Sequence, residues 1–136
     1  MDKHKVKKSK ITGIGFHVPE HVVTNQDLSA FMDTSDEWIQ TRTGIQERRW
    51  VSRDEAVSDL AIPAAKKAMA DANVFPKDID LVIVATLSSD YFFPGVSSQL
   101  QDKLGLRTVG AFDIKAACSA FVYGISIADQ YLRSGT

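Results

Sequence analysis

The chain has 136 residues, of which sixteen are basic and seventeen acidic, so its formal net charge is −1. This length favours one domain with a core of its own. The balanced charge argues against nucleic acid as the main partner, because nucleic-acid-binding domains usually carry a basic excess. One cysteine cannot form an internal disulfide, so a reducing, cytoplasmic location fits best.

The first part of the chain predicts a tail, a strand and two short helices. Residues 1–10 form a lysine-rich tail that we expect to be solvated. "KITGIGFHVP" predicts a strand that Pro19 closes. Thr24 or Asn25 can cap a helix in "TNQDLSAF". In "DTSDEWIQTRTGI", Ser35 or Asp36 is the expected cap and Gly44 the expected end.

The rest of the chain alternates helices with strands. Apolar residues recur at helical spacing over residues 58–73, and the β-branched run "IDLVIVATL" predicts a strand covered on both faces. A helix ending at Gly105, a strand in "TVGAFDIKAA" and a helix from Cys118 to Gly135 follow. This order predicts an α/β fold with a mostly parallel sheet. The last helix is apolar almost all round, so we expect it to be buried at the centre of the protein.

Cys118 stands where the last predicted strand meets the last predicted helix. A lone cysteine in an apolar stretch is most often an inert core residue. The first turn of a helix, however, has unpaired N–H groups and a partial positive charge, which stabilise a thiolate and can hold an oxyanion. The small neighbours Ala116, Ala117, Ser119 and Ala120 leave space for a substrate.

Trp38 and Arg42 are spaced i, i+4, so on a helix they face the same way. A flat aromatic ring beside a planar cation could sandwich a nucleotide base. The alternative is a partly buried tryptophan beside a solvated arginine. For metal binding, one cysteine and the early histidines His4, His17 and His21 offer no ligand spacing, and we expect the latter two to be structural or exposed.

Four blocks resemble the β-ketoacyl-acyl-carrier-protein synthase III family and come in that family's order. They are "GIGFHVPEHVVTNQDL", "DTSDEWIQTRTGIQER", "DLVIVATLSSDYFFP" and "GAFDIKAACSAFVYGISIADQYLRSG". The resemblance covers nearly all of the chain except the lysine tail. It implies that residues 11–136 form the N-terminal half of a thiolase-like domain whose C-terminal half is absent, with a buried central nucleophile helix.

The resemblance also implies roles for single residues. Cys118 matches the nucleophile, Trp38 and Arg42 match residues that stack on the coenzyme A adenine, and Thr34 matches a neighbour of that ligand. Phe93 matches a loop residue that reaches the partner subunit's acyl pocket. The implied enzyme is a cytoplasmic homodimer without a permanent cofactor. It condenses an acyl-coenzyme A such as acetyl-coenzyme A with malonyl-acyl-carrier protein, through an acyl-cysteine, and so initiates fatty-acid synthesis.

Two departures from the family pattern qualify these expectations. Ala120 stands where the family usually has glycine, and its methyl group is expected to narrow the acyl site or shift helix packing. The family's catalytic His and Asn have no counterpart in this chain. We therefore expect the chain alone not to catalyse the condensation, and to expose an unpaired sheet edge and an apolar helix face. The alternatives are a condensing enzyme of secondary metabolism and a non-catalytic fragment with a buried structural cysteine.

Overall fold

The computed structural model describes residues 8–135, which divide into two compact units. The first unit contains residues 8–16 and 57–135, and the second contains residues 17–56. Most of the predicted lysine tail, including His4, lies outside the described residues. In the described part, no helix is long and apolar enough to cross a membrane.

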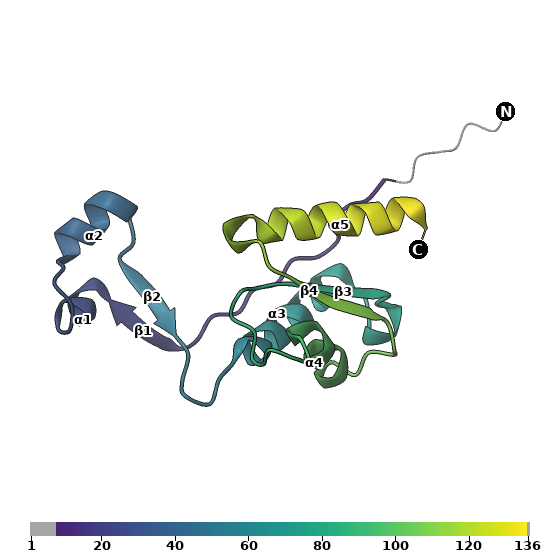
Figure 1. Ribbon diagram of the computed structural model, residues 1–136, viewed down its shortest axis with the longest axis horizontal. Coiled ribbons are helices and arrows are strands. Elements are labelled where there is room, and N and C mark those ends of the chain that lie inside the picture. Colours follow the sequence, from purple (N-terminus) through teal and green to yellow (C-terminus); the bar gives the residue numbers. More distant parts are fainter. Residues whose placement is uncertain (1–7, 136) are drawn as a thin grey trace. The chain divides into compact units, whose positions relative to one another are not determined.

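The first unit is built on a parallel pair of strands, β3 (Leu81–Ala85) and β4 (Gly110–Ile114), as predicted. Their register runs from Leu81 opposite Gly110 to Ala85 opposite Ile114. Three helices accompany the pair: α3 (Val57–Ala72), α4 (Val96–Lys103) and α5 (Ala120–Ser134). A 3₁₀ turn at Pro76–Asp78 leads into β3. Figure 1 shows α5 on one side of the strands and α4 with α3 on the other.

Alternation along β4 explains this layering, because successive side chains of a strand point to opposite faces. The Phe112 ring lies against Tyr131 of α5, and Ile114 lies beside Gly124 of α5. Asp113, between them in sequence, binds the start of α4 instead. The fully or nearly buried apolar residues of this unit are Val96 and Leu100 on α4 and Ala120 on α5.

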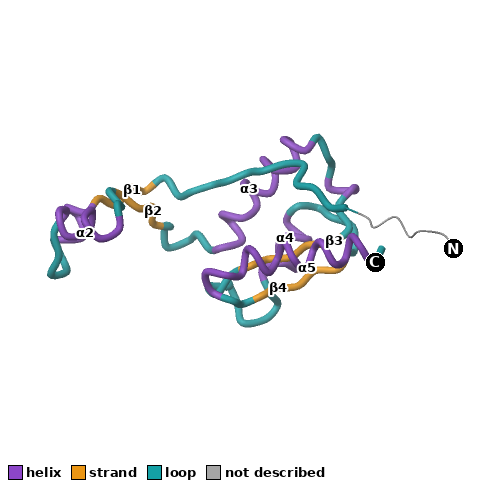
Figure 2. The backbone as a smooth tube through the Cα atoms, turned by 90° about the horizontal axis from the view of Figure 1, so that it is seen from above, coloured by secondary structure: helices purple, strands orange, loops and turns teal. Residues whose placement is uncertain are grey.

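The predicted first strand is wrong, because the chain from residue 8 to Pro19 is irregular and pairs with no described strand. Its first part, residues 8–16, runs along α3 instead (Figure 2). The Ile14 N–H donates to Asp71 and the Lys67 ammonium donates to the Phe16 carbonyl. A β-carbon at Gly13 or Gly15 would stand 2.3 Å from a carbonyl oxygen of α3. The two glycines therefore serve close packing on a helix.

The second unit pairs β1 (His21–Thr24) with β2 (Glu47–Trp50) in antiparallel fashion and carries α1 (Asn25–Ser29) and α2 (Asp36–Thr43). The predicted helix signals are confirmed. Thr24 caps α1 and Ser35 caps α2, and Gly44 ends α2 with a φ of 72°. Strand β2 has the sequence "ERRW", which lacks the apolar alternation that predicts a strand.

Asn25 is the polar centre of the second unit and is 1% exposed. Its amide donates to Asp36 and to the Ile45 carbonyl, each at 2.8 Å, and its carbonyl accepts from Arg48 at 2.7 Å. Hydrogen bonds from Gln40 and then Asn25 hold the pKa of Asp36 below its usual range. One buried amide thus joins α1, α2 and β2.

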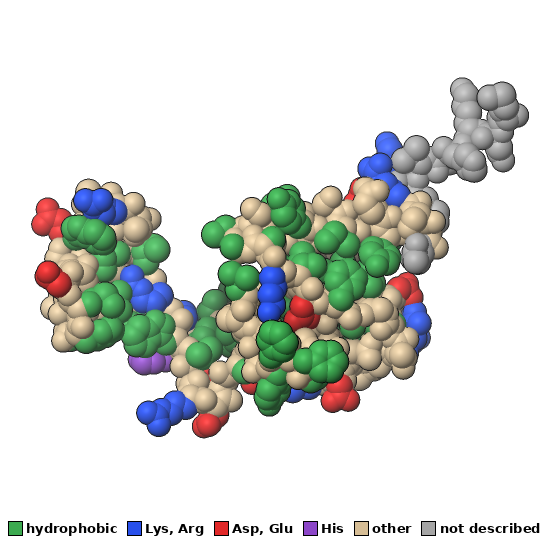
Figure 3. Space-filling view, in the orientation of Figure 1, with side chains coloured by type: hydrophobic (Ala, Val, Ile, Leu, Met, Phe, Trp, Pro, Cys, Tyr) green, Lys and Arg blue, Asp and Glu red, His purple; other side chains and the backbone are tan. Residues whose placement is uncertain are grey.

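Helix α5 forms where the sequence predicts it, but it is more exposed than predicted. The predicted burial is wrong for this chain by itself, because Ala120 is the helix's one buried residue. Phe121 is 71% and Leu132 55% exposed, and Figure 3 shows hydrophobic side chains open to the surface over α5. The helix packs on β3 on one side and has no cover among residues 8–135 on the other. The expectation of an exposed apolar helix face is confirmed.

Candidate functional site

Cys118 lies in the connection from β4 to α5. A short 3₁₀ helix, Ala117–Ser119, precedes α5 without a break, so the thiol sits just before the α-helix. The predicted strand–cysteine–helix order is confirmed, with a 3₁₀ turn in place of the first α-helical turn. The cysteine is exposed and free, which contradicts the alternative of a buried structural thiol.

The backbone around Cys118 has an unusual conformation. Ala117 has a φ of 46°, in the left-handed region that residues with a β-carbon seldom adopt. The Ser119 N–H closes the turn on the Ala116 carbonyl at 3.0 Å. Among residues 8–135, the N–H groups of Ala117 and Cys118 donate to no acceptor. These two N–H groups are therefore free to donate to an acceptor, as an oxyanion requires.

Ala120 is only 4% exposed, whereas Cys118, Ser119 and Phe121 around it are exposed. Its methyl group therefore points into the unit and takes up core volume at the first position of α5.

A second loop leaves the sheet at the same end as the cysteine connection. Residues 86–95 follow β3, and the Thr86 N–H donates to the Ile114 carbonyl at the last residue of β4. Phe93 in this loop is 86% exposed, and its neighbour Phe92 packs beneath the ammonium group of Lys115, 5.8 Å from the ring centre. Strands β3 and β4 are parallel, so the loop with Phe93 and the connection with Cys118 leave the sheet at the same end. In α/β folds, this carboxyl end of the strands carries the reactive loops.

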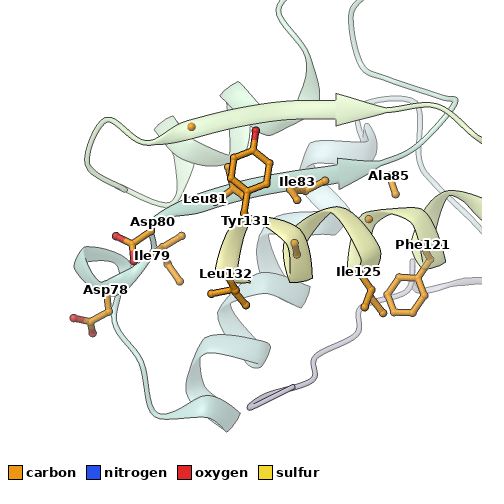
Figure 4. Close-up of a pocket in the computed structure, with 13 residues that line it drawn as sticks. Asp78, Ile79, Asp80, Leu81, Ile83, Ala85, Phe121, Ile125, Tyr131 and Leu132 are labelled. Carbon is orange, nitrogen blue, oxygen red and sulfur yellow. The ribbon is translucent and has the colours of Figure 1, made fainter. Parts of the chain in front are cut away.

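A groove between α5 and β3 adjoins this end of the sheet and has a volume of ≈ 720 Å³. Figure 4 shows Phe121, Ile125 and Leu132 along one wall and Ile79, Leu81, Ile83 and Ala85 along the other. The lining is mostly apolar. The α5 residues that line this groove border the apolar face of α5 that no other described residue covers.

Trp38 and Arg42 lie together on α2, as their spacing predicts. The guanidinium carbon is 4.8 Å from the indole ring centre. The pair lines a shallow pocket of ≈ 340 Å³ with Ser35, Glu37 and Thr41. The 4.8 Å separation leaves no room for a base between the two groups, which would need two stacking distances of about 3.5 Å each. A base must therefore stack on the ring's open face or displace Arg42.

Thr34 stands directly before the cap of α2 and is the remaining predicted site residue of the second unit. Its hydroxyl oxygen is buried and has no hydrogen-bond partner among residues 8–135. An unpaired buried hydroxyl is costly, and a partner that restores its hydrogen bond is favourable.

The two histidines that the structure describes, His17 and His21, do not line the pocket at Trp38 and Arg42. His17 is half-buried, and the His21 ring meets Trp50 edge-on with ring centres 6.4 Å apart. Within residues 8–135, no three His, Cys, Asp or Glu side chains gather in a metal-binding cluster.

Comparisons with known proteins point to one family. A family model described as 3-oxoacyl-(acyl-carrier-protein) synthase III matches residues 112–136. The chain is 53% identical over 127 residues to β-ketoacyl-acyl-carrier-protein synthase III 1 of Vibrio parahaemolyticus, covering 93% of this chain and 40% of the relative. It is 48% identical over 125 residues to the Fusobacterium nucleatum synthase III, covering 92% and 38%. The chain thus spans about 40% of the length of the curated relatives that it matches.

Solved structures agree with the sequence comparisons. The crystal structure of the Aquifex aeolicus 3-oxoacyl-acyl-carrier-protein synthase III is 48% identical and superimposes with a TM-score of 0.88, covering 93% of this chain and 41% of that one. The priming β-ketosynthase of a polyketide biosynthetic pathway is 34% identical with a TM-score of 0.91, covering 99% and 40%. The similarity therefore extends over both units and includes the connection that carries Cys118.

Proposed function

Because this chain belongs to the β-ketoacyl-acyl-carrier-protein synthase III family and represents part of its thiolase-type fold, we propose that it carries the acyl-accepting half of an acyltransferase site. The observation that supports this most directly is the exposed Cys118 on the strand-to-helix connection, with free N–H groups beside it. The whole enzyme initiates fatty-acid synthesis by joining an acyl-coenzyme A starter to malonyl-acyl-carrier protein. It works in the cytoplasm as a homodimer, with no permanent cofactor.

The first half-reaction uses residues of this chain. The Cys118 thiolate attacks the thioester carbonyl of an acyl-coenzyme A, and the carbonyl oxygen becomes an oxyanion that the N–H of Cys118 can bind. The carbon–sulfur bond to coenzyme A then breaks. Coenzyme A leaves as a thiolate and is protonated by solvent, while the acyl group remains on Cys118.

The second half-reaction depends on groups that this chain does not supply. Malonyl-acyl-carrier protein loses carbon dioxide, its carbanion attacks the acyl-cysteine, and the Cys118 thiolate leaves as the 3-oxoacyl product forms. In the family, a His and an Asn stabilise the enolate. His17 and His21 do not match those positions, so the proposal limits this chain to acylation.

Coenzyme A recognition falls to the second unit. Trp38 offers an exposed ring face to the adenine, Arg42 offers a cation, and the unpaired Thr34 hydroxyl offers a hydrogen bond. Phe93 shapes the acyl pocket of the partner subunit. A partner copy therefore completes each acyl site.

The acylation proposal is tested with the purified chain, acetyl-coenzyme A and intact-mass spectrometry. We expect a single acetyl adduct that maps to Cys118 and is absent from the Cys118→Ala variant. Iodoacetamide should alkylate Cys118 in the native chain, because the thiol is exposed. The absence of an acetyl adduct, or a native chain that iodoacetamide does not alkylate, would contradict the proposal. Steady malonyl-dependent product formation by the chain alone would contradict its limitation to acylation.

A condensing enzyme of secondary metabolism is the second candidate, and the structural match to the priming β-ketosynthase favours it. The higher sequence identity to synthase III of fatty-acid synthesis favours the first. Mass spectrometry with a mixture of acyl-coenzyme A thioesters separates them. A preference for acetyl transfer supports the first candidate, and a preference for longer or branched acyl groups supports the second.

A further inference from the structure

The loop that carries Phe93 presents three aromatic side chains in succession. Tyr91, Phe92 and Phe93 are 63%, 98% and 86% exposed. Aromatic side chains on an unsupported loop would collapse onto the nearest apolar surface, because burying each removes a large apolar area from water. Their exposed arrangement therefore needs fixed points in the backbone on either side.

Asp90 provides the fixed point on the N-terminal side of these aromatics. Its two carboxylate oxygens lie 3.0 and 3.3 Å from the backbone nitrogen of Ser58. Ser58 is the second residue of α3 and is completely buried. A carboxylate on an N–H group in a helix's first turn is favoured by both the free donor and the helix dipole. The loop is thus tied to α3 through one side chain.

The receiving residue is itself held in place. The Lys103 ammonium group of α4 donates to the Ser58 hydroxyl at 2.8 Å and pairs with Asp59 at 3.0 Å. Ser58 therefore connects α3, α4 and the loop after β3. A movement of Asp90 relative to the sheet would have to break this connection.

The C-terminal side of the aromatics is fixed at the start of α4. The Val96 N–H donates to Asp113 at 2.8 Å, and Gly95 lies directly against the same carboxylate. Between the two fixed points lie only residues 91–94, which we call the aromatic arch. A short arch with both ends held can place its side chains reproducibly.

We propose that Asp90 is a positioning residue, which holds the aromatic arch at a fixed height above the end of the sheet and thereby sets the acyl length accepted at the acyl site of the partner copy. The acyl-selection part rests on the proposed function. The positioning part rests on the Asp90–Ser58 contact alone. Phe93 is the residue through which Asp90 acts.

The positioning part is tested by limited proteolysis of the wild-type chain and of Asp90→Ala, Asp90→Asn and Asp102→Asn. Chymotrypsin cuts after Tyr91 or Phe92 in the arch, and trypsin after Lys66 or Lys67 in α3 reports global opening. We expect chymotryptic cleavage of the arch to rise about tenfold in Asp90→Ala, since loss of a hydrogen bond to a charged group increases the open population by about that factor. Asp90→Asn should stay within about threefold of wild type, because its amide oxygen still accepts the Ser58 N–H.

Asp102→Asn is the matched control. Asp102 lies exposed on α4, and its side chain has no hydrogen-bond or ion-pair partner among residues 8–135. It should cleave as wild type does. Equal rises of arch and α3 cleavage in Asp90→Ala would indicate a general loss of stability and overturn the proposal, as would unchanged arch cleavage.

The acyl-selection part is tested on the same variants with an equimolar mixture of acetyl-, butyryl- and hexanoyl-coenzyme A. We expect the ratio of acyl groups found on Cys118 to shift by at least about threefold in Asp90→Ala and to return towards wild type in Asp90→Asn. An unchanged ratio alongside faster arch cleavage would overturn acyl selection and support positioning. If wild-type Cys118 accepts no acyl group, the proposed function and acyl selection fail together, and the proteolysis result still decides positioning.

Discussion

A β-carbon on Gly95 would stand 2.8 Å from the carboxylate of Asp113, closer than real β-carbons approach such atoms. The same carboxylate accepts the N–H groups of Val96 at 2.8 Å and Ser97 at 2.9 Å. One side chain therefore joins β4, which leads to Cys118, to the helix that follows the aromatic arch. Because Gly95 has no β-carbon, the start of α4 can approach the Asp113 carboxylate on β4 this closely.

This contact predicts a pH dependence of stability. Burial works to raise the pKa of Asp113, but hydrogen bonds from Ser97 and Val96 outweigh it and hold the pKa below its usual range. Because the folded pKa is below the unfolded value of about 3.9, the stabilisation is present above pH 4 and is lost as pH falls through the folded pKa. Asp113→Asn should lower the free energy of unfolding by about 1 kcal/mol at pH 7.

Urea denaturation between pH 7 and pH 2.5 measures this difference. The gap between wild type and Asp113→Asn should shrink as the pH falls below about 4, since Asp113 has the higher pKa in the unfolded state and protonation there favours unfolding. Asp102→Asn is the control and should follow wild type throughout. A gap that stays constant with pH would show that the charge of Asp113 contributes nothing.

Two glycine substitutions should have opposite effects. A methyl group at Gly13 meets backbone atoms of α3 at 2.3 and 2.6 Å, so Gly13→Ala should cost about 2 kcal/mol or more of unfolding free energy. At Gly124 the nearest atom is the Ile114 side chain at 3.6 Å, an ordinary contact. Gly124→Ala should therefore gain about 0.5–1 kcal/mol from helix propensity. Thermal and urea unfolding check both, and a neutral Gly13→Ala would contradict the packing of residues 8–16 on α3.

The left-handed conformation of Ala117 predicts which residues the position tolerates. With a φ of 46°, a β-branched side chain is strongly disfavoured, so Ala117→Val should cost about 1–2 kcal/mol of unfolding free energy. Ala117→Gly should be neutral or stabilising. The exposed Ala70→Val on α3 is the control for helix propensity alone and should cost less. If Ala117→Val and Ala70→Val lose the same amount of unfolding free energy, the strained turn at Ala117 is refuted.

Binding of coenzyme A at Trp38 should change the tryptophan fluorescence of the chain. The chain has two tryptophans, Trp38 with its open face and Trp50, which packs against the rings of Phe31 and His21. We expect coenzyme A to quench wild type and Trp50→Phe but not Trp38→Phe. Trp38→Ala should weaken coenzyme A binding about tenfold, which is the size of a base-stacking contribution. Quenching that disappears with Trp50 instead would place the ligand elsewhere.

The uncovered face of α5 predicts dye binding and self-association. Phe121 and Leu132 are mostly exposed, and apolar patches of this kind bind 1-anilinonaphthalene-8-sulfonate and promote association. The double substitution Phe121→Ser and Leu132→Ser should reduce dye fluorescence and the sedimentation-derived mass average. Its thermal midpoint should change little because both side chains are exposed. Undiminished dye fluorescence in the double variant would contradict this assignment.

Local chemistry predicted the local structure well. The sequence places each N-cap within two candidates, of which the structure uses Thr24 and Ser35, and it places the helix ends at Gly44 and Gly135, because caps act within a few residues of themselves. The strand predicted before Pro19 was wrong because strand formation depends on a partner far away in sequence, and the glycines of that segment fit a helix surface instead.

The site was predicted only in part, for the same reason. Cys118 and the Trp38–Arg42 pair follow from spacing along the chain. The contacts of Asp90 with Ser58 and of Asp113 with Val96 join residues 32 and 17 positions apart, and no local pattern marks them. The left-handed Ala117 had no sequence signal either, since alanine rarely adopts that conformation.

The docking of residues 8–16 has a consequence during synthesis. The Ser9 hydroxyl donates to Asp129, 120 positions later, and Gly13 and Gly15 need the finished surface of α3. A nascent chain leaves the ribosome N-terminus first, so residues 8–16 emerge before the helices that they contact. Until α3 and α5 have left the exit tunnel, residues 8–16 cannot make these contacts.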